Sequence, residues 1–420
     1  MPSPARSLLG RLEELAQRPL PHFLLLCAFA LTFYGYSISF GLIYDDLPLV
    51  HANHVRWLDQ PWEFRAYYRP LQAFFFAPAL VSSIPAVLHV QNIVVATLIV
   101  FLFGRVLLAL GLGIRLVSLI EAVGVVLPTS MTIFVWICER TEWLPLGLGL
   151  ALVLLTVRPA VRGSRYLAAF LGLSATALLS KESGVALLAL APLLLLARRR
   201  KGLALLVLVS GLALAAAYLA LRSRIVDSSP FSSTVLRTPW TFVETILLGF
   251  LQVLLCSWLP VSFTHSWVSL AFGLIYGAAA FMGLAEMWRR NRPLAVVLLC
   301  LFVTFSGPGI LVWEPRNLAM PGLAVGAFAC YGGARLLESA EMRGGRITEI
   351  VLLTASLCSL ASLTVFSSYA LQDWIGPING TLRAAHYAPK HGLIYHIDMY
   401  VPLQPDTSRS WPPLPPEMLP

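Results

Sequence analysis

Long apolar runs separated by short charged clusters are the feature that most limits what this chain can fold into. Only 12% of the 420 residues are charged and 58% are hydrophobic, whereas a soluble domain carries about 25% charged residues. The runs reach the ~20 residues that a helix needs to cross a bilayer, and they are apolar on all faces. The sequence therefore predicts an all-α, polytopic membrane protein of about eleven transmembrane helices.

Positive charges predict which helix ends face the cytoplasm, because Lys and Arg are enriched in cytoplasmic loops. Basic clusters lie at 105–115, 158–165, 198–201, 289–292 and 335–346. This map makes 1–20 a cytoplasmic N-terminus and 21–368 a transmembrane domain with an external loop at 44–68. Residues 369–420 then form an external C-terminal tail. The net charge of +9 follows the topology pattern, so no nucleic-acid partner is expected.

Individual crossings follow from the same map. The first run, 21–43, is too long for a signal-peptide core and is predicted to be an uncleaved signal anchor. Further helices are expected at 84–110, 116–137, 144–157, 203–221, 268–288, 295–312, 318–334 and 347–368. The run 242–259 is expected to be re-entrant or interfacial, because a full crossing there would put the cluster 289–292 on the wrong side.

The apolar run between two basic clusters is interrupted by Ser180, Lys181, Glu182 and Ser183. Since both flanking clusters are expected inside, the two arms must form a hairpin with Lys181 and Glu182 near its outer tip. Each arm is shorter than the ~20 residues of a full span. The tip is therefore expected below the membrane surface, in a protein-lined cavity that accommodates its charges.

Charged residues on the external side of this topology fall into four groups. The groups are Tyr44-Asp45-Asp46, Glu139-Arg140-Thr141-Glu142, Lys181-Glu182, and Glu314 with Arg316. Charges at membrane depth are costly and usually face a cavity or one another. Any single group would also suit a loop in water, but four groups on one side favour a shared polar site.

An acidic pair and several basic residues give this predicted site a chemistry. A carboxylate of Asp45 or Asp46 could accept a proton from an attacking hydroxyl, although a polar helix cap explains the pair equally simply. Guanidinium groups bind phosphate bidentately and would neutralise it as a leaving group. The candidate cations are Arg69, Arg140, Lys181 and Arg316.

Metal and cysteine chemistry are less marked. His51 and His54 have a spacing that a divalent cation would accept, but exposed loop histidines are commoner, so no metal ligands are assigned. All six cysteines fall in or beside apolar runs without zinc or CxxC spacing, and unpaired thiols are expected. No P-loop, nucleophile elbow or dinucleotide motif occurs in a suitable context.

The order of these motifs resembles the GT-C superfamily of membrane glycosyltransferases. More narrowly, it is similar to the protein O-mannosyltransferases and the related transmembrane-TPR mannosyltransferases. The resembling segments are Tyr44-Asp45-Asp46, Tyr68-Arg69-Pro70-Leu71, His89 with Asn92, Pro128 with Trp136, Arg140 with Glu142, Ser180-Lys181-Glu182, Tyr218 to Arg222, and Glu314-Pro315-Arg316-Asn317-Leu318. The chain differs in having Pro315 between Glu314 and Arg316, and Thr132 where related proteins often have an acid.

This resemblance implies an inverting hexosyltransferase, such as a mannosyltransferase, that uses a polyprenyl-phosphate sugar donor in the membrane. It makes Asp45 or Asp46 the catalytic base. It implies donor-phosphate binding by Arg69, Arg140, Lys181 and Arg316, and supporting roles for Tyr44, Tyr68, Glu142, Glu182, Glu314 and Asn317. Neither the sugar nor the acceptor follows from it, and dependence on a divalent cation stays open.

Two other functions suit the same residues. The first is a non-enzymatic carrier or flippase of lipid-linked sugars, which would use the basic cavity to hold phosphate. A carrier is expected to show inverted repeats, which the sequence lacks. The second is a structural subunit whose charges only set topology. The composition suits a bacterial inner membrane with the site facing the periplasm, with the endoplasmic reticulum as the alternative.

Overall fold

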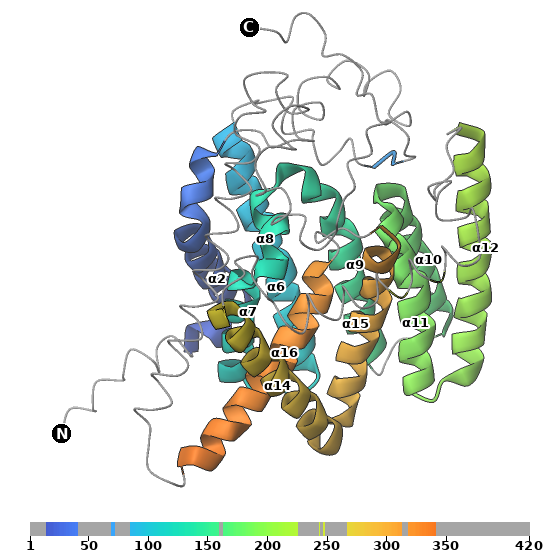
Figure 1. Cartoon of the computed structure of the whole chain (residues 1–420). Helices are drawn as coiled ribbons and strands as arrows, with labels where there is room; N and C mark the ends of the chain where they lie inside the picture. Colours follow the sequence, from blue (N-terminus) through green and yellow to red (C-terminus); the bar gives the residue numbers. More distant parts are fainter. Residues whose placement is uncertain are drawn as a thin grey trace, which may run out of the picture.

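The computed structural model describes residues 14–40, 69–71, 85–158, 163–225, 267–312 and 318–341, together with Val243 and Leu247. Within these residues the fold is all-α, as predicted (Figure 1). The α-helices are α2 (Pro19–Tyr34), α6 (Pro85–Ala109), α7 (Ile114–Val126), α8 (Pro128–Val135), α9 (Arg140–Val157), α10 (Gly163–Ser180), α11 (Val185–Ala197), α12 (Lys201–Ile225), α14 (Trp267–Arg290), α15 (Arg292–Val312) and α16 (Ala319–Glu341). Short 3₁₀ turns are η1 (Gly35–Ser39), η2 (Ile137–Glu139) and η3 (Glu182–Gly184).

Several of these helices are long and apolar enough to cross a membrane. In the described part of the chain they are Pro19–Ser39, Ala86–Ala109, Arg140–Val157 and Lys201–Arg224, and the bent pair α7–α8 makes a fifth if it forms one span. This length and hydropathy indicate an integral membrane protein. The total of eleven crossings also depends on segments outside the described residues and stays a prediction.

Helix α12 shows what a lipid-facing element of this fold looks like. It lies at the edge of the bundle in Figure 1, and only 22% of its most apolar stretch is buried. Leu205, Val209 and Leu212 are all more than half exposed. A monomeric soluble protein rarely leaves such a continuous apolar face uncovered, so hydrocarbon is the environment that suits it.

The single helix predicted at 116–137 is wrong. The structure has two helices, α7 and α8, which are bent by 68° at Leu127 and Pro128. Pro128 lacks an N–H donor and disfavours helical geometry in the residue before it, and Leu127 is accordingly extended, with φ −68° and ψ 135°. The break frees backbone carbonyls at the end of α7, one of which, that of Val125, accepts a 2.8 Å hydrogen bond from the Tyr34 hydroxyl.

The other predicted bounds differ mainly at the ends. The α-helical part of the first run stops at Tyr34 and continues as the 3₁₀ turn η1, rather than reaching residue 43. Helix α9 begins at Arg140 instead of residue 144, because its charged first turn is buried and paired rather than exposed in a loop. The runs 242–259 and 347–368 and the tail 369–420 lie outside the described residues, apart from Val243 and Leu247.

Two of the basic clusters meet at the same place in the bundle. Asn291 joins α14 to α15, directly after the cluster that ends α14, and its side chain donates a 3.1 Å hydrogen bond to the carbonyl of Leu110 at the end of α6. The cluster at 289–292 therefore lies beside the one at 105–115. The charge map predicts that both clusters face the cytoplasm, and this contact is compatible with that prediction.

Helices α14 and α16 pack backbone to backbone. A Cβ atom at Gly283 would lie 1.8 Å from the Phe328 carbonyl oxygen, and one at Gly332 would lie 2.2 Å from that of Ala279. Small residues permit such close approach between membrane helices. This crossing fixes α16 against the bundle and leaves no room for any side chain at the two glycines.

Candidate functional site

The hairpin predicted around Lys181 and Glu182 is present. Helix α10 ends at Ser180, η3 turns the chain, and α11 returns from Val185. The turn is tight, since a Cβ atom at Gly184 would lie 2.4 Å from the backbone of Ala177. This geometry places four consecutive polar side chains, 180 to 183, at one end of two apolar helices.

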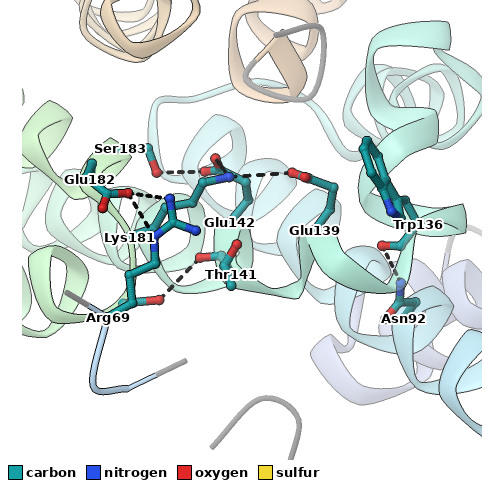
Figure 2. Close-up of polar contacts among 10 residues, drawn as sticks. Arg69, Asn92, Trp136, Glu139, Thr141, Glu142, Lys181, Glu182 and Ser183 are labelled. Carbon is teal, nitrogen blue, oxygen red and sulfur yellow. Dashed lines mark hydrogen bonds and ion pairs between the residues drawn. The ribbon is translucent and has the colours of Figure 1, made fainter. Parts of the chain in front are cut away.

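Two hydroxyl groups join this tip to the start of α9, and Figure 2 shows the one from Ser183. Ser180 donates to the backbone carbonyl of Thr141 at 3.2 Å. Ser183 donates to Oε2 of Glu142 at 2.8 Å. Both contacts are buried. A hydrogen bond to a charged group, such as that of Ser183 to the Glu142 carboxylate, is worth about 1.5–3 kcal/mol.

Lys181 lies between two carboxylates at the same junction. Its ammonium nitrogen is 2.6 Å from Oε1 of Glu142 and 3.7 Å from Oε2 of Glu139. The three side chains are 8%, 3% and 0% exposed. A cation and two anions withdrawn this far from water stabilise a fold only while they remain paired.

Arg69 attaches a different stretch of chain to the tip. Its Nε and Nη2 atoms lie 2.9 and 2.5 Å from Oε2 of Glu182. Two residues later, the backbone N–H of Leu71 donates to the carbonyl of Leu179 at 3.1 Å. Figure 2 shows Arg69 beside Glu182, whereas the Lys181 ammonium group lies near Glu142 and Glu139. The segment that ends at Arg69 is therefore fastened to the hairpin.

Arg140 is held on the side of the site that faces α6. Its guanidinium donates to Oδ1 of Asn92 at 2.8 Å and to the carbonyl of Leu88 at 2.7 Å, and lies 5.6 Å from the centre of the Trp143 ring. Asn92 in turn donates to the carbonyl of Trp136 at 2.8 Å. Arg140 is only 1% exposed, so in this structure it joins α9 to α6. Asn92 on α6 thus makes an interhelical hydrogen bond with Arg140 on α9.

Both ends of the segment 41–68 are attached to this region. Phe40 precedes the segment, and its ring meets that of His89 edge-on, with 6.3 Å between the ring centroids. His89 is on α6, one turn before Asn92. Arg69 follows the segment and is paired with Glu182. The segment that carries Asp45 and Asp46 thus leaves the described structure beside α6 and rejoins it at the hairpin tip.

The structure brings together five residues that the sequence assigned to a site, and a sixth side chain completes the set. We call this set the charged network: Arg69, Glu139, Arg140, Glu142, Lys181 and Glu182. Its three cations balance its three carboxylates. The charged network keeps ionised side chains paired where little water reaches them. Binding of a donor phosphate by its cations stays a prediction.

The remaining predicted site residues cannot be placed. They lie outside the described residues: Tyr44, Asp45, Asp46, Tyr68, Glu314, Arg316 and Asn317. Asn92, Ser180 and Ser183 were not predicted as site residues. Ser180 and Ser183 flank Lys181 and Glu182 in the sequence, and the signal for Asn92 was a polar side chain within an otherwise apolar helix.

Metal and thiol chemistry have little support in the part of the chain that the structure describes. No three His, Cys, Asp or Glu residues there are grouped to hold a metal ion. Cys27, Cys300 and Cys330 carry free thiols, as expected. His51 and His54 fall outside these ranges, so a divalent cation in that loop is untested.

Comparison of the chain with protein-family models, curated proteins and solved structures finds no match. The resemblance to GT-C mannosyltransferases therefore stays a prediction from short motifs. Its functional meaning depends on the geometry of the charged network.

Proposed function

We propose that the chain is an inverting glycosyltransferase with GT-C-like architecture and about eleven crossings. It moves a sugar, such as mannose, from a polyprenyl-phosphate donor to an acceptor hydroxyl on the external face of the membrane. The supporting observation is the charged network, buried at one end of apolar helices. Ionisable side chains in such surroundings usually mark a substrate or ion pathway, because they are costly to keep there.

Chain length allows the proposed base to approach this network. Asp45 is the fifth residue after Phe40, whose ring contacts His89. An extended chain spans at most ~3.6 Å per residue, so the Cα atoms of Phe40 and Asp45 lie within about 18 Å of each other. The proposal requires one of the two aspartates to lie beside the cations, and this length of chain is compatible with it.

The chemistry assigns a role to each sign of charge. Asp45 or Asp46 takes the proton of the acceptor hydroxyl, while the oxygen of that hydroxyl forms a bond to the anomeric carbon. The bond from that carbon to the donor phosphate breaks on the opposite face, so the anomeric configuration is inverted. The phosphate oxygen leaves with the electron pair, and a nearby guanidinium or ammonium group stabilises the charge. Arg69 and Lys181 are the described cations at the hairpin tip.

Sugar transfer by the purified protein tests this proposal. The donor is a radiolabelled polyprenyl-phosphate mannose, and the variants are Asp45→Asn and Asp46→Asn, with Glu286→Gln as a control outside the charged network. One aspartate variant is expected to lose about 10²- to 10⁴-fold in turnover while its melting temperature stays unchanged. Equal turnover in all variants would contradict the assignment of the base. A parallel assay with chelator decides whether a divalent cation is needed.

A carrier of lipid-linked sugars is the second candidate, favoured by the broken helix α7–α8. Discontinuous helices often line the binding site of transporters, and this break buries Thr129 and Ser130 without hydrogen-bond partners for their hydroxyls. Reconstituted protein that moves the labelled donor across the bilayer without cleaving it would support the carrier. The proposed location is a bacterial inner membrane with the site facing the periplasm.

A further inference from the structure

The ion pair of Arg69 and Glu182 differs from the other pair at the hairpin tip. Its side chains are 14% and 32% exposed, whereas those of Lys181 and Glu142 are 8% and 3% exposed. An ion pair that keeps some contact with water contributes less than a fully buried one, and breaking a fully buried pair leaves an uncompensated charge. Arg69 is thus the cation at the tip whose partner can be replaced most easily.

The contact itself is one-sided. Both guanidinium contacts go to Oε2 of Glu182, and Oε1 is buried without a hydrogen-bond partner. Arginine prefers a planar anion that accepts from two nitrogens through two separate oxygens, and phosphate also offers this arrangement. The Glu182 carboxylate therefore occupies a position that a phosphate could take, while its own second oxygen has no hydrogen-bond partner.

We propose that Glu182 is an internal substitute for a phosphate group: it holds Arg69 in the free protein and is exchanged for a phosphate oxygen when a prenyl phosphate binds. This assignment of the ligand rests on the proposed function. The exchange replaces one anion by another at the same guanidinium, so no buried cation is left unpaired at either stage. Glu182 lies in the turn η3 and is exposed enough to rotate toward water once released.

Competition of this kind predicts whether a substitution of Glu182 raises or lowers the affinity for phosphate. If Glu182 competes with the ligand, Glu182→Gln removes the competing charge and keeps the side-chain shape, so phosphate binding becomes tighter. A partly exposed pair of this type contributes up to about 1 kcal/mol, which corresponds to roughly fivefold in affinity. If Glu182 only holds the hairpin in place, the same variant binds the ligand equally or more weakly.

Equilibrium binding of farnesyl phosphate to the full-length protein in nanodiscs tests the exchange. Glu182→Gln is expected to lower Kd roughly fivefold, and Arg69→Gln is expected to raise it more than tenfold. Glu286→Gln is the matched control, because it removes the carboxylate partner of Arg290 one turn along α14. Tighter binding in this control too would mean that net charge is responsible and would overturn the proposal.

Two further arms identify the ligand chemistry. Farnesol lacks the phosphate, and its weaker binding is expected to be the same in the wild type and in Glu182→Gln. Inorganic phosphate lacks the lipid, and if it shows the same gain in Glu182→Gln, the site recognises phosphate whatever its source. A gain with farnesol would show that Glu182 does not compete with phosphate and would overturn the proposal.

A second variant, Glu182→Asp, keeps the test decisive if Glu182→Gln does not fold. Glu182→Asp keeps the charge but cannot reach Arg69 as well, so a Kd between those of the wild type and Glu182→Gln is expected. Unchanged or weaker farnesyl phosphate binding in whichever of these variants keeps the wild-type melting temperature would overturn the exchange.

Turnover measured on the same preparations separates the two proposals. Tighter binding in Glu182→Gln without donor cleavage by the wild type would overturn the proposed transferase function and support the exchange of Glu182 for phosphate. Donor cleavage by the wild type with no gain in Glu182→Gln would do the reverse.

Discussion

The ammonium nitrogen of Lys181 lies 2.6 Å from Oε1 of Glu142, where the α10–α11 hairpin meets the first turn of α9. Both residues are almost completely buried. Glu142 also accepts a hydrogen bond from Ser183 through its other oxygen. One carboxylate therefore fixes two positions of the hairpin tip, and the geometry of the candidate site depends on this pair.

Replacing Lys181 by Met is expected to destabilise the protein strongly. The substitution keeps the length of the side chain but leaves Glu142 and Glu139 buried without their cation, which costs about 3–5 kcal/mol. Thermal unfolding of the purified protein measures the effect as a lower melting temperature. Adding Glu142→Gln to Lys181→Met removes one uncompensated charge, and part of the loss is expected to return. A double variant no more stable than Lys181→Met would contradict the pairing.

Asn92 is expected to be a positioning residue for Arg140. Its amide is hydrogen-bonded to Arg140 and to the Trp136 carbonyl, so Asn92→Ala leaves two buried groups short of a partner at about 1–3 kcal/mol each. The matched control is Asn291→Ala, which also removes two hydrogen bonds, but half-buried ones without a charged partner: one to the Leu110 carbonyl and one from the Leu294 N–H. The melting temperature should fall clearly further for Asn92→Ala. Equal falls would show that Arg140 does not depend on Asn92.

The sequence predicted the hairpin and several helix bounds because these follow from the length of apolar runs. Lys181 and Glu182 interrupt a run that both basic flanks place on one side, and few folds other than a hairpin satisfy this. The partners of these charges were not predictable, because a spacing pattern does not say which of two glutamates, Glu139 or Glu142, lies nearer a lysine. That depends on how α9 rotates against α10.

The break between α7 and α8 was missed for another reason. Hydropathy averages over a window, so Pro128 in the middle of an apolar run hardly changes the mean, although its missing N–H ends the helix. The start of α9 was wrong for the reverse reason: a loop was predicted at the charged residues 139–142, where the structure already begins the helix at Arg140. Burial of Arg140 by Asn92 makes helix favourable there, and such burial is a tertiary property.

Glycine at the crossing of α14 and α16 provides a stability test within a single helix. Gly332→Ala places a methyl group 2.2 Å from the Ala279 carbonyl and forces the helices apart, at a cost of about 1–3 kcal/mol or more. Gly333→Ala changes the next residue, where nothing lies within 4 Å, and is expected to be neutral or stabilising by up to about 1 kcal/mol through helix propensity. Melting temperatures of the two variants decide this. Similar values would mean that the close crossing is absent.

A buried contact between His22 and Glu121 lies apart from the charged network and tests how α6 accommodates it. Nε2 of His22 on α2 is 2.6 Å from Oε2 of Glu121 on α7, and a Cβ atom at Gly104 on α6 would lie 1.8 Å from Oε1 of Glu121. Gly104→Ala is therefore expected to destabilise the wild type by displacing the carboxylate from His22. Glu121→Ala should also destabilise it, because it removes the partner of His22 and leaves a cavity.

These two substitutions should not add. In the Glu121→Ala background the methyl group of Gly104→Ala enters space that the carboxylate has vacated, so its cost largely disappears. The coupling energy expected for residues in direct contact is about 1–3 kcal/mol, measured as a double-mutant cycle of unfolding in a mild detergent. Additive effects would show that Gly104 does not provide the space for Glu121, and the contact of α6 with α7 would need another explanation.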